Sequence, residues 1–293
     1  MTRDFREVPI EKVKEYWDRR PCNVRHSQAP VDSKQYSEEV SARRYFVEPH
    51  TLEFAEFPLW LKKNVLEIGC GIGTDAINFA RHGAYVAVVD LSPESLRVAK
   101  ARAKACGLNQ RRGCFREIRF YCGDAERLSE VVPSGWYDLV YSLGVIHHTP
   151  HPEKVLQEIR AYLKPDAYGL TQGQLRLLVY NRYSWKTFWI VFGRYGKGRF
   201  WRWRELVAQH SEAQEGSPIT YTYTKRELGE LLESCGYRVK SMYVRHIFPY
   251  SIPEYIKGEY KKVWYFRWLP AGLFRWLEHH IGWHLCAIAE RDD

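Results

Sequence analysis

Hydrophobic residues along the chain gather into short runs that end at acidic or glycine-rich turns. The run in "NVLEIGCGIGTDA", Asn64 to Ala76, ends at Glu67, and Gly69, Gly71 and Gly73 follow. A helix-like pattern of apolar positions begins directly after this turn. A buried strand, a tight turn and a helix in this order indicate an α/β protein that makes room for a nucleotide.

Three further runs repeat this arrangement. "YVAVVDLS", Tyr85 to Ser92, predicts a second strand that ends at Asp90, and Asp124 follows a third strand. "YDLVYSLGVIHHTP", Tyr137 to Pro150, predicts a fourth strand. Each strand is followed by a helix signal, such as Ser92 as the N-cap of the next helix. Strands that alternate with helices imply a parallel sheet covered on both faces, with ligands at the carboxyl ends of the strands.

The glycine spacing excludes two common phosphate sites. A dinucleotide turn has a glycine at its sixth position, where this chain has Thr74, and no Gly-Lys-Ser/Thr ending is present. Glu67 would also repel a phosphate at this turn. The pattern favours a ligand with a cationic part and hydroxyl groups, and Asp90 lies where a carboxylate can accept both ribose hydroxyls. A tight turn in an α/β fold without this ligand is the alternative.

The motifs "LEIGCGIG", "VVDLS", "GDAERL" and "YDLVYSLGVIHHTP" occur together in this order. With them the chain resembles the class I S-adenosylmethionine (SAM) dependent methyltransferases, particularly the group that includes ubiquinone-biosynthesis-type enzymes. The resemblance is close over residues 64–165 and loose over residues 224–290. It implies an α/β, Rossmann-like fold with a seven-stranded, mostly parallel sheet, here with N-terminal and C-terminal helical cap insertions. It also implies SAM as cofactor and S-adenosyl-L-homocysteine as product.

The resemblance assigns cofactor-binding roles to individual residues. The glycine turn would lie against the methionine moiety and ribose, Asp90 would hold the ribose, and Asp124 would cap the adenine amine. The fourth-strand exit would line the cofactor near its reacting sulfur. The residues predicted to bind the cofactor are Glu67, Gly69, Cys70, Gly71, Gly73, Asp90, Leu91, Asp124, Ala125, Ser142, Leu143 and Gly144.

Four segments are predicted along the chain. Residues 1–63 form an N-terminal cap or lid, residues 64–180 the SAM-binding core, and residues 181–223 a basic aromatic cap insertion. Residues 224–293 complete the core and contain an aromatic insertion at 246–282. Relatives usually have Pro-Gly-Gly before the fifth strand, whereas this chain has Pro165-Asp166-Ala167 and an extra stretch. The placement of the fifth strand therefore stays open.

Composition adds limits on the class of protein. The 293 residues are 45% hydrophobic, which suits one domain with insertions, and no apolar run is long enough to span a bilayer. The first residues are charged throughout, and the seven cysteines form no CxxC pair. We expect a cytoplasmic protein with reduced thiols and without a transmembrane segment. The oligomeric state stays open.

Positive charge is concentrated in one segment. Residues 167–204 contain eight Lys or Arg and no acid, in a chain of net charge +9, and aromatic residues are interleaved with them. Such a surface could bind RNA, cover an anionic or thiol substrate as a lid, or face lipid at a membrane surface. It could also be an amphipathic cap with solvated charges. We favour a cap or a small-molecule lid, because aromatic residues at helical spacing are usually buried.

Candidate catalytic and acceptor-binding residues flank the predicted cofactor site. His147 and His148 follow the fourth strand, and one of them could act as a general base, since an imidazole titrates near neutral pH. A structural role is equally open for each. His26 is a second candidate base. The residues predicted to line the acceptor pocket are Tyr16, Trp17, Asn23, Tyr180, Asn181 and Tyr183.

No metal site is predicted. His279, His280 and His284 lie near Glu278 but lack the spacing of metal ligands, so we expect them to be solvated. The leading hypothesis is a SAM-dependent methyltransferase that acts on a small-molecule O, N or S nucleophile, a small thiol included. An RNA (tRNA) methyltransferase is the alternative. A non-catalytic SAM-binding regulatory protein is the second alternative.

Overall fold

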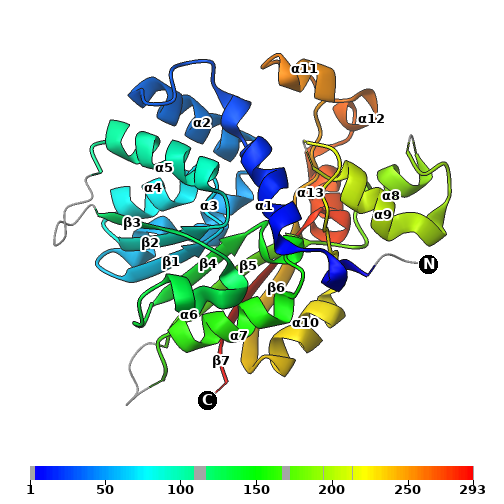
Figure 1. Cartoon of the computed structure of the whole chain (residues 1–293). Coiled ribbons are helices and arrows are strands. Elements are labelled where there is room, and N and C mark those ends of the chain that lie inside the picture. The colour runs from blue at the N-terminus through cyan, green and yellow to red at the C-terminus, as the bar shows by residue number, and fades with distance from the viewer. Residues whose placement is uncertain (1–3, 109–116, 167–171, 194, 213, 293) are drawn as a thin grey trace.

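A central β-sheet with helices packed against it forms the core of the molecule. The computed structural model describes residues 4–108, 117–166, 172–193, 195–212 and 214–292. These residues form a seven-stranded sheet in the order β3-β2-β1-β4-β5-β7-β6, shown in Figure 1. The strands are β1 (Asn64–Ile68), β2 (Tyr85–Asp90), β3 (Ile118–Cys122), β4 (Leu139–Leu143), β5 (Gln174–Tyr180), β6 (Tyr237–Arg245) and β7 (His284–Arg291).

The first five strands run parallel. β1 pairs with β2 and β4, β2 pairs with β3, and β4 pairs with β5, all in parallel. β7 runs antiparallel between β5 and β6. The mostly parallel seven-stranded sheet predicted from the sequence is confirmed, and the fifth strand begins at Gln174. Because β7 is reversed, its first residue, His284, pairs with Tyr180 at the end of β5 and with Arg245 at the end of β6.

Helices cover both faces of the sheet. They are α1 (Ile10–Arg19), α2 (Lys34–Val47), α3 (His50–Ala55), α4 (Thr74–Arg81), α5 (Pro93–Ala105), α6 (Leu128–Val131), α7 (Pro152–Tyr162), α8 (Trp185–Phe192), α9 (Trp203–His210), α10 (Lys225–Ser234), α11 (Ile252–Ile256), α12 (Trp264–Arg267) and α13 (Ala271–Ile281). In β1, Val65 packs with α3, α4 and α5, and Leu66 packs with α6, α7 and α10. Both side chains are buried, as expected for a strand in the middle of a parallel sheet.

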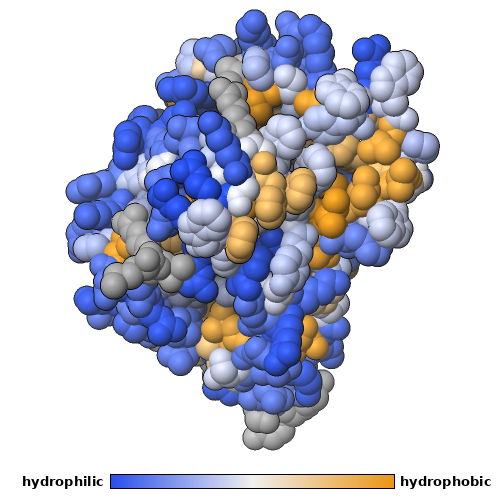
Figure 2. Space-filling model, turned by 90° about the vertical axis from the view of Figure 1, so that its right-hand side faces the viewer, coloured by the Kyte–Doolittle hydropathy of each residue, from blue (hydrophilic) through white to orange (hydrophobic). Residues whose placement is uncertain are grey.

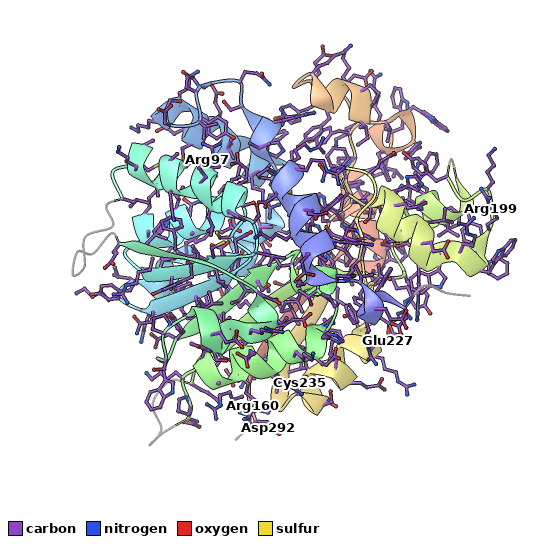
Figure 3. The ribbon with its side chains drawn as sticks, viewed as in Figure 1. Arg97, Arg160, Arg199, Glu227, Cys235 and Asp292 are labelled. Atoms are coloured by element: carbon purple, nitrogen blue, oxygen red, sulfur yellow. The ribbon has the colours of Figure 1, made fainter. Side chains whose placement is uncertain are left out.

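Local capping signals in the sequence operate as predicted. The Ser92 hydroxyl accepts a hydrogen bond from the Ser95 amide at the start of α5. At α10, Thr224 and Glu227 form a reciprocal capping box. Figure 3 labels Glu227 there and also shows Arg160 of α7, whose guanidinium donates to the carbonyl of Asp292 and so ties α7 to the chain after β7.

Helix α1 lies across the carboxyl ends of the strands (Figure 1). The Asp18 carboxylate accepts from the Ser92 hydroxyl at 2.6 Å and from the Glu94 amide at 3.2 Å, where α5 begins. On the other side, the Tyr16 hydroxyl donates to the Gln214 carbonyl, and the Gln214 amide donates to the Tyr16 carbonyl at 2.7 Å. The helix therefore joins the nucleotide half of the sheet to the basic aromatic insertion.

The basic aromatic insertion is less buried than we expected. Trp185, Tyr195 and Trp203 are partly buried, but six other aromatic residues are 44–71% exposed: Tyr183, Phe188, Trp189, Phe192, Phe200 and Trp201. The expectation that the aromatic residues pack on the core is wrong for these six. Trp185 and Trp189 of α8 instead contact Tyr265 of α12, and Figure 2 shows hydrophobic residues gathered on the face that α8 presents. Residues 167–171 and Arg194 of this segment lie outside the described residues.

None of the described helices has the length and apolar character needed to cross a membrane.

The fully buried guanidinium of Arg102 provides a test of how α5 packs against α2 and the glycine turn. Arg102 of α5 donates to the Ile72 carbonyl at 2.6 Å and to the Thr74 hydroxyl at 2.8 Å, and it also reaches the Ser37 carbonyl of α2. We expect Arg102→Met to lower the free energy of unfolding by roughly 2–4 kcal/mol, because buried acceptors lose their partners. Urea denaturation measures this change.

The matched control is Arg97→Met on the same helix. Arg97 is exposed, and among the described residues it pairs only with Glu94, at 2.7 Å. Its loss should therefore change the free energy of unfolding by less than about 1 kcal/mol. Equal effects of the two substitutions would contradict the role assigned to Arg102.

Candidate active site

The glycine turn after β1 is built for left-handed backbone. Gly69, Gly71 and Gly73 have φ angles of 72°, 52° and 76°. A Cβ on Gly69 would overlap Val145, and one on Gly73 would press on Ala99 at 3.0 Å. A Cβ on Gly71 would meet no atom within 4 Å. Two of these glycines therefore permit close packing inside the protein, and Gly71 borders open space where a ligand fits.

The carboxylate of Asp90 is held in place beside this turn. One of its oxygens accepts from the Gly71 amide at 2.7 Å, and the other accepts from the Ser92 amide at 2.9 Å. Burial raises the pKa of Asp90 to about 6, although these two amide hydrogen bonds act to lower it. Each carboxylate oxygen keeps a further lone pair, so the group can accept from two ligand hydroxyls.

Glu67 at the end of β1 has a carboxyl oxygen without a partner among the described residues. Its side chain is buried, and its Oε2 atom makes no hydrogen bond to any described residue. Burial is the main cause that raises the pKa of Glu67 well above its usual value, and Asp75 and Asp90 add to it. A cationic ligand group beside Oε2 would relieve both the desolvation and the repulsion.

The remaining predicted cofactor residues lie at the same edge of the sheet. Asp124 follows β3, and its carboxylate accepts from the Glu126 amide at 2.9 Å. Ser142 in β4 has a buried hydroxyl without a partner among the described groups. Leu91 packs against a buried cluster that includes Phe5, Val8 and Val13 of the N-terminal segment. The other members of the predicted set are neighbours of these groups in the strand-end turns: Cys70, Ala125, Leu143 and Gly144.

The two adjacent histidines after β4 are both fully enclosed. Neither ring nitrogen of His147 has a partner among the described residues, and its ring lies 3.9 Å from that of Tyr180. The Nδ1 atom of His148 is 2.7 Å from the Ile219 carbonyl, which fixes Nδ1 as the donor and leaves Nε2 as an acceptor. The Trp17 ring of α1 packs against His148 at 5.2 Å. Burial lowers the pKa of both histidines.

Charged residues that the sequence did not single out as catalytic surround His148. The carboxylate of Glu212 is 3.7 Å from His148 Nε2 and acts to raise the pKa of this imidazole against the effect of burial. Lys186 lies near the same carboxylate, and its ammonium is 4.7 Å from the centre of the Trp283 ring. Glu212 lies in no sequence motif, and Lys186 is one of many basic residues in segment 167–204. No local pattern could therefore have shown that these two residues lie near His148.

Cys22 also reaches this region. Its thiol is accessible to solvent, yet burial among protein atoms and the nearby Glu212 raise its pKa. It also influences the titration of Tyr180 and Lys186.

Two predicted acceptor residues are used elsewhere. The Asn181 side-chain amide donates to the carbonyls of Gly282 and Tyr183 at 2.9 and 3.2 Å, so it supports the backbone. Tyr183 is 71% exposed. The structure does not bring these two residues into a pocket beside His148.

The four site residues predicted near the N-terminus also lie in different surroundings. Tyr16 is buried and holds the segment at Gln214, and Trp17 reaches His148. Asn23 is partly buried with a left-handed backbone, and its substrate role stays a prediction. His26 contacts Tyr255 of α11 at 3.1 Å, and burial lowers its pKa to about 3. The structure therefore places the His26 ring against the aromatic insertion, where it is neutral.

The solvated location predicted for three C-terminal histidines is only partly right. His279 and His280 are exposed on α13, as expected. His284 is only 7% exposed, because β7 runs between two other strands and its first residue lies beneath the loops at their ends. The expectation of a solvated His284 is wrong.

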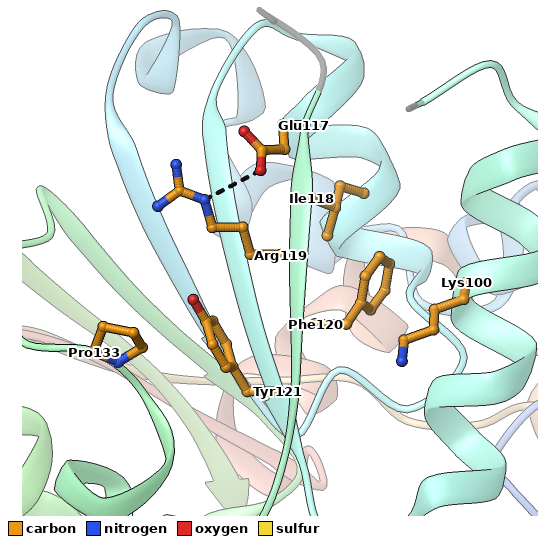
Figure 4. A pocket seen from close by; sticks show the side chains of 7 residues that line it. All are labelled: Lys100, Glu117, Ile118, Arg119, Phe120, Tyr121 and Pro133. Atoms are coloured by element: carbon orange, nitrogen blue, oxygen red, sulfur yellow. Dashed lines mark hydrogen bonds and ion pairs between the residues drawn. The ribbon is translucent and has the colours of Figure 1, made fainter. Parts of the chain in front are cut away.

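A hollow of about 580 Å³ lies apart from these groups, at the edge strand β3, as Figure 4 shows. Its lining residues are Lys100, Glu117, Ile118, Arg119, Phe120, Tyr121 and Pro133. None of them is a predicted site residue. The strand ends therefore remain the candidate active site.

Comparison with known proteins identifies this arrangement. Residues 65–166 match the family described as methyltransferase domain. Residues 65–166 therefore form a methyltransferase domain within the seven-stranded sheet. The chain is 31% identical over 122 residues to a ubiquinone biosynthesis O-methyltransferase of Coxiella burnetii, covering 41% of this chain and 48% of the relative. It is 34% identical over 106 residues to norajmaline N-methyltransferase of Rauvolfia serpentina, covering 36% and 34%.

A solved structure shows that the similarity of fold extends further than the matched sequence. Magnesium protoporphyrin IX methyltransferase from Synechocystis PCC 6803, with bound S-adenosylhomocysteine, aligns with a TM-score of 0.53 and 14% identity. The alignment covers 97% of this chain and 100% of that chain. The chain spans about half the length, or less, of the curated relatives it matches.

The residues of the methyltransferase domain fit SAM. Asp90 offers carboxylate oxygens for ribose hydroxyls, and Glu67 offers a buried, unpaired oxygen for a cationic amine. Gly71 borders open space, which lets a ligand contact the protein backbone at this turn. Each of these three features matches a different part of the cofactor.

The raised pKa of Asp90 predicts how ligand affinity changes with pH. Because this pKa is about 6, Asp90 is mostly ionised at pH 7 and mostly protonated at pH 5. Protonation removes an acceptor for ribose hydroxyls, so the affinity for S-adenosylhomocysteine should fall by about tenfold between pH 7 and pH 5. Calorimetric titration across this range measures the change.

The control for that experiment is Asp90→Asn. Its amide does not titrate, so its weaker affinity should change little over the same range. Parallel pH dependence in the two proteins would show that another group is responsible.

Proposed function

We propose that this protein is a SAM-dependent methyltransferase that transfers a methyl group to an oxygen, nitrogen or sulfur atom of a small molecule. The observation that carries the proposal is the juxtaposition of two sets of groups at one sheet edge. Glu67, Gly71 and Asp90 suit the cofactor, and the His148–Glu212 pair lies at the next strand end. The similarity to a ubiquinone biosynthesis O-methyltransferase and to norajmaline N-methyltransferase supports the same activity.

SAM supplies an activated methyl group on a positively charged sulfur. The residues of this chain have to hold the cofactor, exclude water and accept a proton from the acceptor atom. Asp90 and Glu67 serve the first task. The Trp17 ring of α1 packs against His148. The hydrogen bonds of Asp18 and Tyr16 hold this helix across the strand ends. We propose that this N-terminal cap closes over the bound cofactor.

The proton of the acceptor would pass to Nε2 of His148. The Ile219 carbonyl keeps the proton of the neutral ring on Nδ1, so Nε2 carries the free lone pair. Burial favours the neutral, basic form of the ring before reaction. Once Nε2 gains a proton, the Glu212 carboxylate at 3.7 Å stabilises the imidazolium. His148 is the proposed general base, and Glu212 is a positioning residue that acts through it.

A second candidate function is methylation of RNA. The exposed rings of Phe200 and Trp201 lie beside Arg199 and Arg202, which is a suitable surface for stacking bases and neutralising phosphates. Against it, His147 and His148 are fully buried beneath the cap. A small acceptor reaches such a position more readily than a polynucleotide does. A purely regulatory role has no comparable support, because it leaves the His148–Glu212 pair unexplained.

We also propose a cytoplasmic location. Six of the seven cysteines are described, and all six are free. Free thiols are typical of reducing compartments.

A labelling experiment distinguishes the two acceptor classes. The protein is incubated with methyl-labelled SAM and with separated small-metabolite and RNA fractions. We expect label in the small-metabolite fraction, and we expect charge reversal of Arg199, Arg202 and Arg204 to leave this transfer unchanged. Label in tRNA that is lost on charge reversal would support the RNA function instead. RNA affinity should then fall by about 0.7 log units per log unit of salt for each contacted phosphate.

Substitutions at the proposed base test the mechanism with whichever acceptor takes up label. His148→Gln should lower kcat by about 10²–10⁴ while leaving the affinity for S-adenosylhomocysteine unchanged. Glu212→Gln should lower kcat less and move the acidic limb of its pH profile to lower pH, because the carboxylate raises the pKa of His148.

The exposed His279 provides the control. His279→Gln should behave as wild type. An unaltered pH profile in Glu212→Gln would contradict the coupling of Glu212 to His148.

A further inference from the structure

Three buried histidine rings contact one another beyond the end of β5. His50 begins α3, His246 follows β6, and His284 begins β7. The ring centres are 5.2 Å apart for His50 and His246, 5.0 Å for His50 and His284, and 4.8 Å for His246 and His284. Burial is the first cause that lowers the pKa of each ring. All three are therefore neutral imidazoles, the form in which histidine binds metals.

A carboxylate completes a set of possible ligands. One ligand atom each from Glu48, His246 and His284 lies within 4.8 Å of the other two. Nδ1 of His284 is 2.9 Å from Nε2 of His50, so Nε2 of His284 remains available. Two imidazoles and one carboxylate thus converge from three separate parts of the sequence.

We propose that Glu48, His246 and His284 bind a divalent transition metal ion of the Zn²⁺ type, with His50 orienting His284. Two histidines and one glutamate form a donor set for zinc that leaves a coordination position open. Mg²⁺ and Ca²⁺ prefer sites made of oxygen atoms, so a site with two imidazole nitrogens discriminates against them. The hydrogen bond from a ligand imidazole to a second group is the usual way in which such a ring is oriented.

The backbone holds these ligands in place. His284 is paired with Tyr180 and Arg245 in the sheet, and the Trp283 amide donates to the His246 carbonyl at 2.7 Å. His246 has a φ angle of 73°, which is an unfavourable conformation for a residue with a side chain. The protein therefore keeps His246 beside His284 at a cost in backbone energy.

A cation of the protein competes for the same carboxylate. Arg44 pairs with Glu48 one helical turn away on α2. The charges of Arg44 and Lys186 also act to lower the pKa of His246 and His284. A bound metal would have to displace the Arg44 guanidinium from Glu48. Replacing Arg44 by a neutral side chain should therefore strengthen metal binding, which a purely structural histidine cluster does not predict.

The position of the cluster suggests what the metal would serve. The Tyr180 ring stacks on His284 at 6.2 Å and contacts His147 at 3.9 Å, so the cluster borders the acceptor side of the candidate active site. An open coordination position there could bind a thiolate or phenolate of the acceptor. This role rests on the proposed methyltransferase function, whereas metal binding itself does not.

The experiment measures zinc binding by the full-length protein after removal of metals with a chelator. Titration with Zn²⁺ against a chromophoric competitor gives the affinity, and native mass spectrometry gives the stoichiometry. We expect one ion per chain. Glu48→Gln and His246→Gln should weaken binding by about 100-fold or more, and His50→Gln by about 10- to 100-fold. Arg44→Met should tighten binding, and His279→Gln should leave it unchanged.

X-ray absorption of the zinc-loaded wild type provides a test that does not depend on the folding of variants. Nitrogen and oxygen neighbours at about 2.0–2.1 Å support the site, and sulfur neighbours at about 2.3 Å would assign the ion to cysteines and overturn it. Absence of stoichiometric binding, or binding that Glu48→Gln and His246→Gln leave intact, would also overturn it. Affinity for S-adenosylhomocysteine is measured on the same samples, so loss of the cofactor site and loss of the metal site are distinguished.

Discussion

Parallel pairing of β1 with its two neighbours is the constraint on which the rest of the structure depends. In a parallel pair the carboxyl ends of both strands meet at the same edge of the sheet. Glu67 and Asp90, from β1 and β2, therefore lie together with the glycine turn between them. The neighbouring β4 brings His147 and His148 to the same edge. A slip of one residue in this register would turn these side chains to the wrong face.

Several buried polar groups at this edge lack hydrogen-bond partners, which is unusual in a protein interior. Glu67 has an unpaired buried oxygen, and His147 has two unpaired ring nitrogens among the described groups. Such groups lower stability unless a ligand or partner compensates them. The rest of the sheet has the opposite character, with apolar residues packed against helices on both faces. The packed core therefore supports a strand-end site that a ligand would complete.

The reversed strand β7 sets the chemistry of the acceptor side. It carries His284 to the end of β5, where the insertion after β6 supplies His246 and the junction of α2 and α3 supplies Glu48 and His50. Helix α1 lies across the neighbouring strand ends and is attached at Ser92 on one side and at Gln214 on the other. The additions to the methyltransferase core thus converge on the half of the site where the acceptor would bind. Cofactor and acceptor functions are divided between the shared sheet and these additions.

The sequence by itself determined the features whose causes are local. The left-handed glycine turn, the Ser92 cap, the capping box at Thr224 and the acid after each of the first three strands depend on residues a few positions apart. Tertiary structure alone decided that Glu212 lies beside His148, that Asn181 supports backbone and that His284 is buried. These outcomes depend on how distant insertions pack and on the order of β7 and β6 in the sheet. Side chains that meet through long-range packing leave no periodic pattern in the chain, whereas turns and caps do.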